Sequence, residues 1–267
     1  MGRRPLRAPG RAGYSVRPMV RERRPVLDRL AGASRRFQVH ALVELDVGEA
    51  RARLAGAEPR VSWTGFVVAT LGRAVARHPE VNARRVGNRI LMFDRVDIGA
   101  TVEREHEGRR VLDITVVRDA DRKTCAAVTA ELHEAKGART ALARPTRFTG
   151  VVVRLPGPLR RAAIRAAGRS VPLAAGFGPA VGVTSMGMFS HAWGWAVPLA
   201  PLTVIATVGG VVDRPAVVDG AVGVRPMLPL TLSFDHALID GAPAARFTET
   251  LRELFETAAV LPPPADR

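Results

Sequence analysis

The sequence predicts one α+β domain in which helices pack on a β-sheet. Segments with strand-like and helix-like periodicity alternate irregularly along the 267 residues, and 47% of the residues are apolar, enough to bury a sizeable core. No internal repeat and no break in composition marks a second domain. We therefore assign residues 19–260 to the domain, with a basic, disordered tail at 1–18 and a short C-terminal tail at 261–267.

Apolar periodicity and helix breakers predict the elements of the first half of the chain. The clearest helix covers 62–78, because Ser62 is a suitable N-cap, Phe66 and Leu71 belong to an apolar face, and Pro79 ends the pattern. In chain order we expect a helix at 19–30, a strand at 37–47, a helix after Asp46, the 62–78 helix, strands at 88–103 and 110–117 joined by a polar turn at 105–108, and a helix from about 123 to 135.

The second half begins with a basic segment at 156–172 that prolines bound on both sides. It is predicted as a short amphipathic connector lying on the domain, and a membrane-surface or partner helix is the alternative. The dipeptide at 219–220, Asp-Gly, indicates a β-hairpin. Further on we expect strands at 180–189, 202–212 and 229–234, and a last helix from about 242 to 258 with Phe247, Leu251, Leu254 and Phe255 on one face.

The composition excludes several classes of protein. The net charge is +15, but all basic residues except Lys123 and Lys136 are arginines in a chain rich in Ala, Gly, Val and Pro, which indicates codon bias. No nucleic-acid module is present, so we expect no nucleic-acid partner. A single cysteine, Cys125, rules out an intrachain disulfide and a multi-cysteine metal site. No signal peptide and no unbroken apolar span is found, so we expect a cytoplasmic protein without membrane insertion.

Residues 232–241, LSFDHALIDG, carry the most informative polar pattern in the chain. His236 follows the end of a predicted strand, and Gly241 precedes the last helix, so rigid neighbours hold the imidazole while it can still face a cavity. Because its unperturbed pKa is near 6.5, a histidine there is suited to act as a general base. Asp240, at the helix start, is expected to bond to backbone amides and to a neighbouring arginine.

A second set of polar residues ends another predicted strand. In GVTSMG, at 182–187, the hydroxyls of Thr184 and Ser185 could donate to a developing oxyanion, although such a pair is more often structural. His78 and His133 are interpreted as structural or solvated. His191, with the tryptophans of SHAWGW, could line a pocket, but buried packing is favoured. No Ser-His-Asp triad, phosphate loop or metal-ligand cluster has a convincing spacing.

The segment LSFDHALIDGAPAARF resembles the signature D-H-R-x-x-D-G of the acyltransferase core of 2-oxo acid dehydrogenase complexes, the dihydrolipoamide acyltransferases. These enzymes share the fold of chloramphenicol acetyltransferase. Other blocks resemble that core in the same order and cover most of 20–258, namely HPEVNA, VDIGATV, VVRDADRKT, VTSMGMF, VIATVGGVVDRPAVVDG and VRPMLPLTLSFDH. The resemblance implies a chloramphenicol acetyltransferase-like fold, with a mixed β-sheet covered by helices.

The resemblance also implies a mechanism. His236 would deprotonate the thiol of coenzyme A or dihydrolipoamide, and Thr184 would hydrogen-bond to the tetrahedral oxyanion, with Ser185 beside the substrate. The acyl carrier, coenzyme A or lipoamide, would be a substrate, and no metal would be required. Members of the family are trimers whose active sites lie between subunits. We therefore expect a homotrimer or a multiple of it, with a separate lipoyl-carrying protein as a possible partner.

This chain departs from the family pattern at several points. Ala237 replaces the arginine of the signature, and no lipoyl domain precedes the core, so we expect a free-standing relative with altered specificity. Condensation enzymes share His-x-x-x-Asp-Gly, but they fuse two such domains and usually carry a second histidine at the position of Asp235. A non-catalytic trimeric scaffold or binding module is the remaining alternative, against which His236, Asp240, Gly241 and Thr184 argue. Arg23 and Arg29 are candidates to pair with Asp240.

Overall fold

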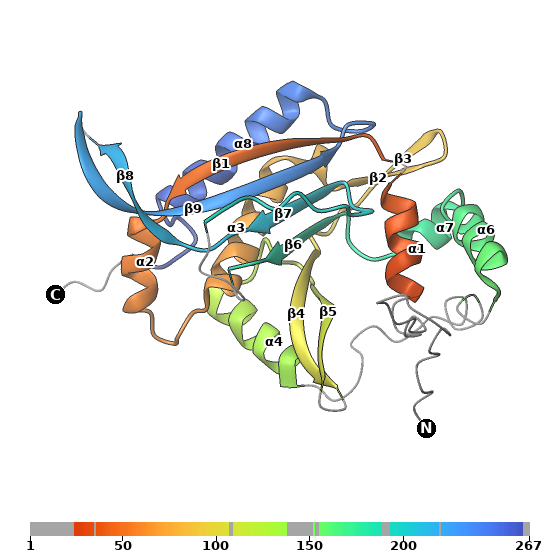
Figure 1. The fold of residues 1–267 in the computed structure, drawn as a ribbon, viewed down its shortest axis with the longest axis horizontal. Coiled ribbons are helices and arrows are strands. Elements are labelled where there is room, and N and C mark those ends of the chain that lie inside the picture. Colours follow the sequence, from red (N-terminus) through yellow and green to blue (C-terminus); the bar gives the residue numbers. More distant parts are fainter. Residues whose placement is uncertain are drawn as a thin grey trace, which may run out of the picture.

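A computed structural model describes residues 24–34, 36–106, 109–137, 152, 155–187, 193–218 and 220–263. The N-terminal segment predicted as a tail and the segment around His191 fall outside these ranges. Within them, the chain forms a seven-stranded mixed sheet with helices on one face and a separate two-stranded sheet (Figure 1). The expectation of an α+β domain is confirmed.

The main sheet has the strand order β1-β9-β7-β6-β4-β5, and β8 pairs with the first part of β9. Adjacent strands are antiparallel except for β4 with β6 and β6 with β7, which are parallel. The first strand therefore lies beside the last one, with Gln38 opposite Asp235. The strands are β1 Gln38–Asp46, β4 Ile98–His106, β5 Arg109–Val117, β6 Val181–Ser185, β7 Val204–Val208, β8 Val212–Val218 and β9 Ala221–Asp235, with β2 Ala83–Val86 and β3 Arg89–Met92 in the small sheet.

The helices fall into two groups (Figure 1). Helices α2 Gly48–Ala55, α3 Trp63–Arg77, α4 Cys125–Gly137 and α8 Gly241–Glu256 pack on one face of the main sheet. Helices α1 Arg24–Ala33, α6 Gly157–Ala167 and α7 Val171–Ala175 gather beside one end of the sheet. Helix α3 begins as predicted, because the Ser62 hydroxyl accepts a hydrogen bond of 3.0 Å from the Gly65 amide.

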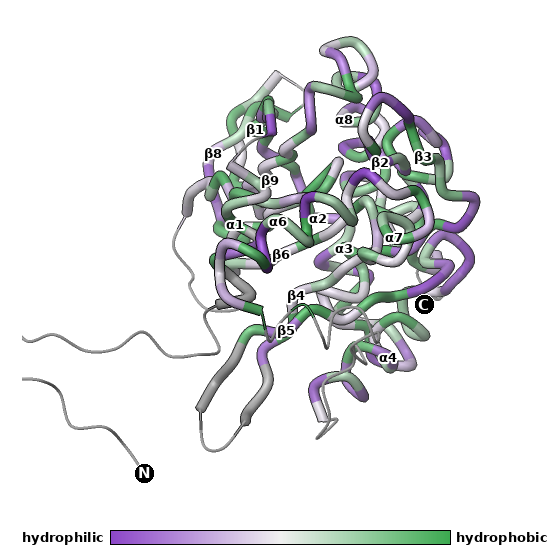
Figure 2. The backbone as a smooth tube through the Cα atoms, turned by 90° about the vertical axis from the view of Figure 1, so that its right-hand side faces the viewer, coloured by the Kyte–Doolittle hydropathy of each residue, from purple (hydrophilic) through white to green (hydrophobic). Residues whose placement is uncertain are grey.

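The hydrophobic core lies between the main sheet and the first group of helices. The rings of Phe66 in α3 and Phe255 in α8 pack edge to face, with their centroids 5.3 Å apart. The rings of Phe234 in β9 and Phe247 in α8 pack in the same way at 5.9 Å. Hydrophilic stretches lie towards the periphery, for example around the β2–β3 hairpin (Figure 2). The core also includes Leu261, which the sequence analysis assigned to the C-terminal tail but which is buried.

Two sequence predictions of strands are corrected. The strand expected at 88–103 is two strands, β3 and β4, with a break between them. The Asn82 side-chain amide donates to the carbonyls of Phe93 and Arg95, at 2.9 and 2.8 Å, and so holds the break in place. The strand expected at 202–212 ends at Val208, where the Gly209 amide bonds to Pro229 O of β9, and β9 itself begins at Ala221, eight residues before the predicted start.

The basic segment at 156–172 forms α6 and the beginning of α7. Arg160 of α6 is buried and pairs with Asp28 of α1 at 2.5 Å, so the segment is fixed to the N-terminal helix. Arg161, Arg165 and Arg169 are exposed. No helix in the described ranges is long and apolar enough to cross a membrane.

Candidate active site

The turn that carries His236 joins the end of β9 to the start of α8. The amides of Leu238 and Ile239 both donate to the Asp235 carbonyl, at 2.9 and 3.0 Å, so the chain turns tightly around His236. The Ile239 side chain is fully buried and anchors the turn in the core. The His236 side chain points outward and is 43% exposed. An imidazole on a rigid turn with an accessible ring can take up and return protons.

Two other segments hold the backbone of the turn. The His236 amide donates to the Phe37 carbonyl at 2.6 Å, and the Asp235 amide donates to the Thr203 carbonyl at 2.8 Å. Phe37 directly precedes β1, and Thr203 directly precedes β7. Because both neighbours of β9 contribute a carbonyl, the position of the His236 backbone is set by the sheet itself.

Asp240 lies beside the imidazole and does not form the predicted bonds to the backbone amides of the helix start. Its Oδ1 is 3.5 Å from His236 Nδ1, and its side chain is 85% exposed. It occupies the N-cap position of α8, but its side chain accepts no hydrogen bond from the helix amides. Because the carboxylate turns back toward the imidazole and into solvent, it does not hold the turn. Arg23 and the side chain of Arg29, the expected arginine partners, are outside the described part of the chain.

The buried carboxylate at this end of the sheet belongs to Asp235. Its side chain is 1% exposed and forms an ion pair with the Arg36 guanidinium, and its Oδ1 accepts a hydrogen bond of 3.2 Å from the Ala237 amide. The sequence analysis missed Arg36. No local pattern distinguishes it among so many arginines, because its partner lies 199 residues away.

A second buried arginine lies close to this pair. Burial and, secondly, the charge of Arg36 lower the pKa of Arg84 to about 10. The Arg84 guanidinium donates to the carbonyls of Ala174, Gly178 and Pro179, at 2.6, 2.9 and 2.8 Å. It therefore joins the small β2–β3 sheet to the segment that leads from α7 into β6.

Thr184 and Ser185 end strand β6, at a distance from His236 within the chain. Thr184 lies opposite Thr207 of β7, which lies opposite Thr231 of β9. From Thr231 to the end of β9 is four residues, about 13 Å, and β6 is two strands from β9, about 10 Å. The Thr184 backbone is thus about 16 Å from Asp235 at the end of β9, and His236 lies one residue beyond, so the two side chains are too far apart to reach one reacting atom.

The threonine row lies on the sheet face opposite the core helices. The Thr207 and Thr231 hydroxyls are buried and have no hydrogen-bond partner among the described residues, whereas Thr184 is only half-buried. Trp195, whose neighbourhood was a candidate pocket wall, is also half-buried and donates from Nε1 to the Val43 carbonyl at 3.1 Å. Thr184 is therefore the member of the row best placed to meet a substrate.

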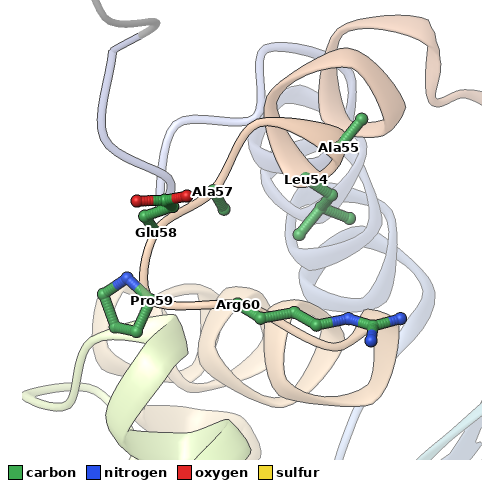
Figure 3. Close-up of a pocket in the computed structure, with 6 residues that line it drawn as sticks. All are labelled: Leu54, Ala55, Ala57, Glu58, Pro59 and Arg60. Carbon is green, nitrogen blue, oxygen red and sulfur yellow. The ribbon is translucent and has the colours of Figure 1, made fainter.

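Neither of the two hollows found in the described residues contains His236 or Thr184. The larger, about 570 Å³, lies by the segment between α2 and α3, and Figure 3 shows the Glu58 and Arg60 side chains pointing away from one another there. The other, about 400 Å³, lies near α7 and the β2–β3 sheet.

The match to known families identifies the chain. The model of the 2-oxoacid dehydrogenases acyltransferase (catalytic domain) matches residues 17–155 and 159–261. The protein belongs to this acyltransferase family. The family expectation drawn from LSFDHALIDG and the other blocks is confirmed, and the interruption of the match falls at the start of the basic segment.

Curated relatives of this chain are components of dehydrogenase complexes. It is 27% identical over 203 residues to the dihydrolipoyllysine-residue succinyltransferase component of the 2-oxoglutarate dehydrogenase complex of Azotobacter vinelandii, covering 76% of this chain and 43% of the relative. It is 26% identical over 266 residues to the lipoamide acyltransferase component of the branched-chain alpha-keto acid dehydrogenase complex of Pseudomonas aeruginosa, covering 93% and 55%. The chain spans about half the length of these relatives.

Solved structures confirm the fold of this chain. A probable dihydrolipoamide acetyltransferase from Listeria monocytogenes superimposes with a TM-score of 0.69 at 20% identity, covering 95% of this chain and 98% of that one. The cubic core of a pyruvate dehydrogenase multienzyme complex gives 0.67 at 23% identity, covering 92% and 93%. Chloramphenicol acetyltransferase gives 0.50 at 14% identity, covering 89% and 96%. The predicted chloramphenicol acetyltransferase-like fold is therefore confirmed.

Proposed function

We propose that the protein transfers an acyl group between a thioester, acyl-coenzyme A or acyl-lipoamide, and a thiol or other acceptor. The family membership supports this proposal, and the observation that carries it is the exposed imidazole of His236 on a rigid turn whose backbone is bonded to both neighbouring strands. A general base needs this combination of fixed backbone and accessible ring.

The proposed reaction with a thiol acceptor uses His236 and Thr184. The imidazole removes the proton from the acceptor thiol, and the thiolate sulfur attacks the carbonyl carbon of the thioester. The Thr184 hydroxyl donates to the oxyanion of the tetrahedral intermediate. When the intermediate collapses, the bond to the donor sulfur breaks, and the leaving thiolate takes the proton back from the imidazolium. Ser185 would contact the substrate beside Thr184, and Asp240 would pair with the charged imidazole.

The site is proposed to form between subunits, because in one chain Thr184 lies about 16 Å from the end of β9 and His236 lies one residue beyond that end. A homotrimer, or a multiple of it, would bring the His236 end of one chain to the Thr184 end of the next. One face of the β8–β9 ribbon supports an assembly. Val217 and Val222 lie opposite each other, and with Val224 they are about three-quarters exposed, an apolar surface of the kind that protein contacts cover.

The acyl carriers proposed here are coenzyme A and lipoamide, and a separate lipoyl-carrying protein is a possible partner. The name of the Pseudomonas aeruginosa relative, a lipoamide acyltransferase component, supports the lipoamide assignment. A non-catalytic trimeric scaffold is the second candidate, favoured by Ala237 at the position of the signature arginine. The two candidates differ in whether His236 is required for turnover.

A thiol-release assay tests the proposal. Acetyl-coenzyme A and longer acyl-coenzyme A esters are each offered with dihydrolipoamide and with simple alcohol and amine acceptors, using wild type and His236→Ala. We expect turnover in the wild type and a loss of about 10²- to 10⁴-fold in the variant. A folded His236→Ala protein with undiminished turnover would contradict the general-base assignment. A folded wild-type trimer inactive with every pair would favour the scaffold.

A further inference from the structure

The ion pair between Arg36 and Asp235 lies at the residue directly before His236. The Asp235 carboxylate receives the Arg36 guanidinium on one oxygen and the Ala237 amide on the other. Its bonds therefore join the residues immediately before and after His236 into one unit. The Asp235 side chain is 1% exposed and the Arg36 side chain 18%, so solvent screens this pair only weakly.

Arg36 and Phe37 form a short segment that reaches the turn twice. The Phe37 carbonyl accepts the His236 amide, and the preceding residue provides the guanidinium for Asp235. Beyond them, Gln38 begins β1 opposite Asp235. A displacement of this segment would therefore shift both the backbone of His236 and the carboxylate beside it.

Of the two neighbouring guanidinium groups, those of Arg36 and Arg84, only that of Arg36 is paired with the Asp235 carboxylate. The pKa of Arg84 is lowered first by burial and then by the charge of Arg36, which places the two guanidinium groups within electrostatic reach of each other. Arg84 bonds to carbonyl groups, whereas Arg36 has a carboxylate partner in Asp235. Removing either member of the pair would leave an uncompensated buried charge next to the turn.

We propose that Arg36 and Asp235 are positioning residues that hold the turn so that the His236 imidazole faces the acyl acceptor in one orientation. The proposal rests on the proposed function, in which His236 is the general base. Neither residue reaches the reacting atoms, and both act through the backbone of the turn. Ala237 occupies the position of the arginine in the family signature. In this chain, the positive charge beside the histidine is provided by Arg36.

The test compares full-length Arg36→Met, Asp235→Asn and Arg36→Lys with a matched control, Arg160→Met. The control breaks another buried arginine–carboxylate pair, between α6 and α1. In the thiol-release assay we expect Arg36→Met and Asp235→Asn to lower kcat about 10- to 100-fold with KM changed less than about threefold, because a small misplacement of a catalytic group affects the chemical step. Arg36→Lys should recover most of kcat, and Arg160→Met should keep kcat while lowering thermal stability.

A spectroscopic measurement gives a readout that does not require turnover. In protein with ¹⁵N-labelled histidine, the ring signals of His236 are assigned by their loss in His236→Gln. We expect these signals to change in Arg36→Met and to remain unchanged in Arg160→Met. If Arg36→Met does not fold, the double variant Arg36→Met/Asp235→Asn removes both charges and takes its place.

The outcomes separate the two proposals. Unchanged kcat and unchanged His236 ring signals in folded Arg36→Met would overturn the positioning role, as would an equal loss of kcat in Arg160→Met. If the wild type shows no turnover, the proposed function fails, and the ring signals still decide whether Arg36 and Asp235 position the imidazole. If turnover is present but insensitive to Arg36, the proposed function stands and the positioning role fails.

Discussion

Mixing two inactive variants tests whether each active site is shared between subunits. His236→Ala removes the proposed general base, and Thr184→Ala removes the proposed oxyanion donor. Within one chain, the Thr184 backbone lies about 16 Å from the end of β9, which His236 directly follows. Each variant alone should lose about 10²-fold or more of its activity. Chains carrying the two substitutions, co-expressed with different affinity tags, should assemble into mixed trimers.

The expected activity follows from the geometry of a closed ring. In a head-to-tail contact, each site takes its histidine from one chain and its threonine from the next. With equal random mixing, about one quarter of the contacts join an intact histidine to an intact threonine. The unfractionated mixture should therefore show about one quarter of the wild-type rate per chain in the thiol-release assay, and trimers isolated through both tags about one third, far above either variant alone.

Two controls make the mixing experiment decisive. His236→Ala mixed with Arg36→Met places both defects at the same end of the sheet, so the mixture should not exceed the average of its two parents. Ser185→Ala in place of Thr184→Ala tests whether the oxyanion donor is the neighbouring hydroxyl. Tag-verified mixed trimers with no more activity than the single variants would refute the shared site.

Three further predictions concern stability and reactivity. Ser62→Ala should lower the free energy of unfolding by about 1 kcal/mol, measured by urea denaturation, because the α3 cap bond to Gly65 is lost. Gly72→Ala should destabilise by about 1–3 kcal/mol, because its Cβ would lie 2.7 Å from Ala120 C, whereas Gly32→Ala in α1 meets no atom within 4 Å and should be neutral or stabilising. Burial raises the pKa of the Cys125 thiol to about 11, so alkylation at pH 8 should be much slower in native than in denatured protein. For the same reason, the thiol's contribution to the free energy of unfolding should be lost as the pH rises from about 9 through 11. A rapid reaction of the native thiol would contradict the burial argument.

Local apolar periodicity was sufficient to predict the elements that are stabilised mainly by burying one amphipathic face. Helix α3, with its Ser62 cap, and strand β1 lie where the sequence places them. The break between β3 and β4 could not be predicted, because it depends on the Asn82 side chain bonding to carbonyls 11 and 13 residues away. The early start of β9 depends on its pairing with β8. Tertiary hydrogen bonds decided these boundaries.

The residues of the candidate site also divide into those that local sequence indicated and those that depend on tertiary contacts. His236 was proposed as a site residue because strand, histidine and helix start follow one another in the sequence, and Thr184 and Ser185 because their hydroxyls end a predicted strand. Arg36 was missed because it is brought to the turn by the pairing of the first strand with the last. Asp240 was expected to bond at the helix start, but its side chain lies in solvent beside His236.

The pairing of β1 with β9 also bears on the order in which the protein folds during synthesis. Strand β1 leaves the ribosome early, and its partner follows almost 200 residues later, so β1 remains an unpaired edge for most of translation. The contacts that seat His236 are among the last to form, because they need Phe37 and Asp235 together. Such distant pairing is slow. Nascent chains that lack β9 should therefore be more susceptible to protease and to aggregation through the exposed edge of β1.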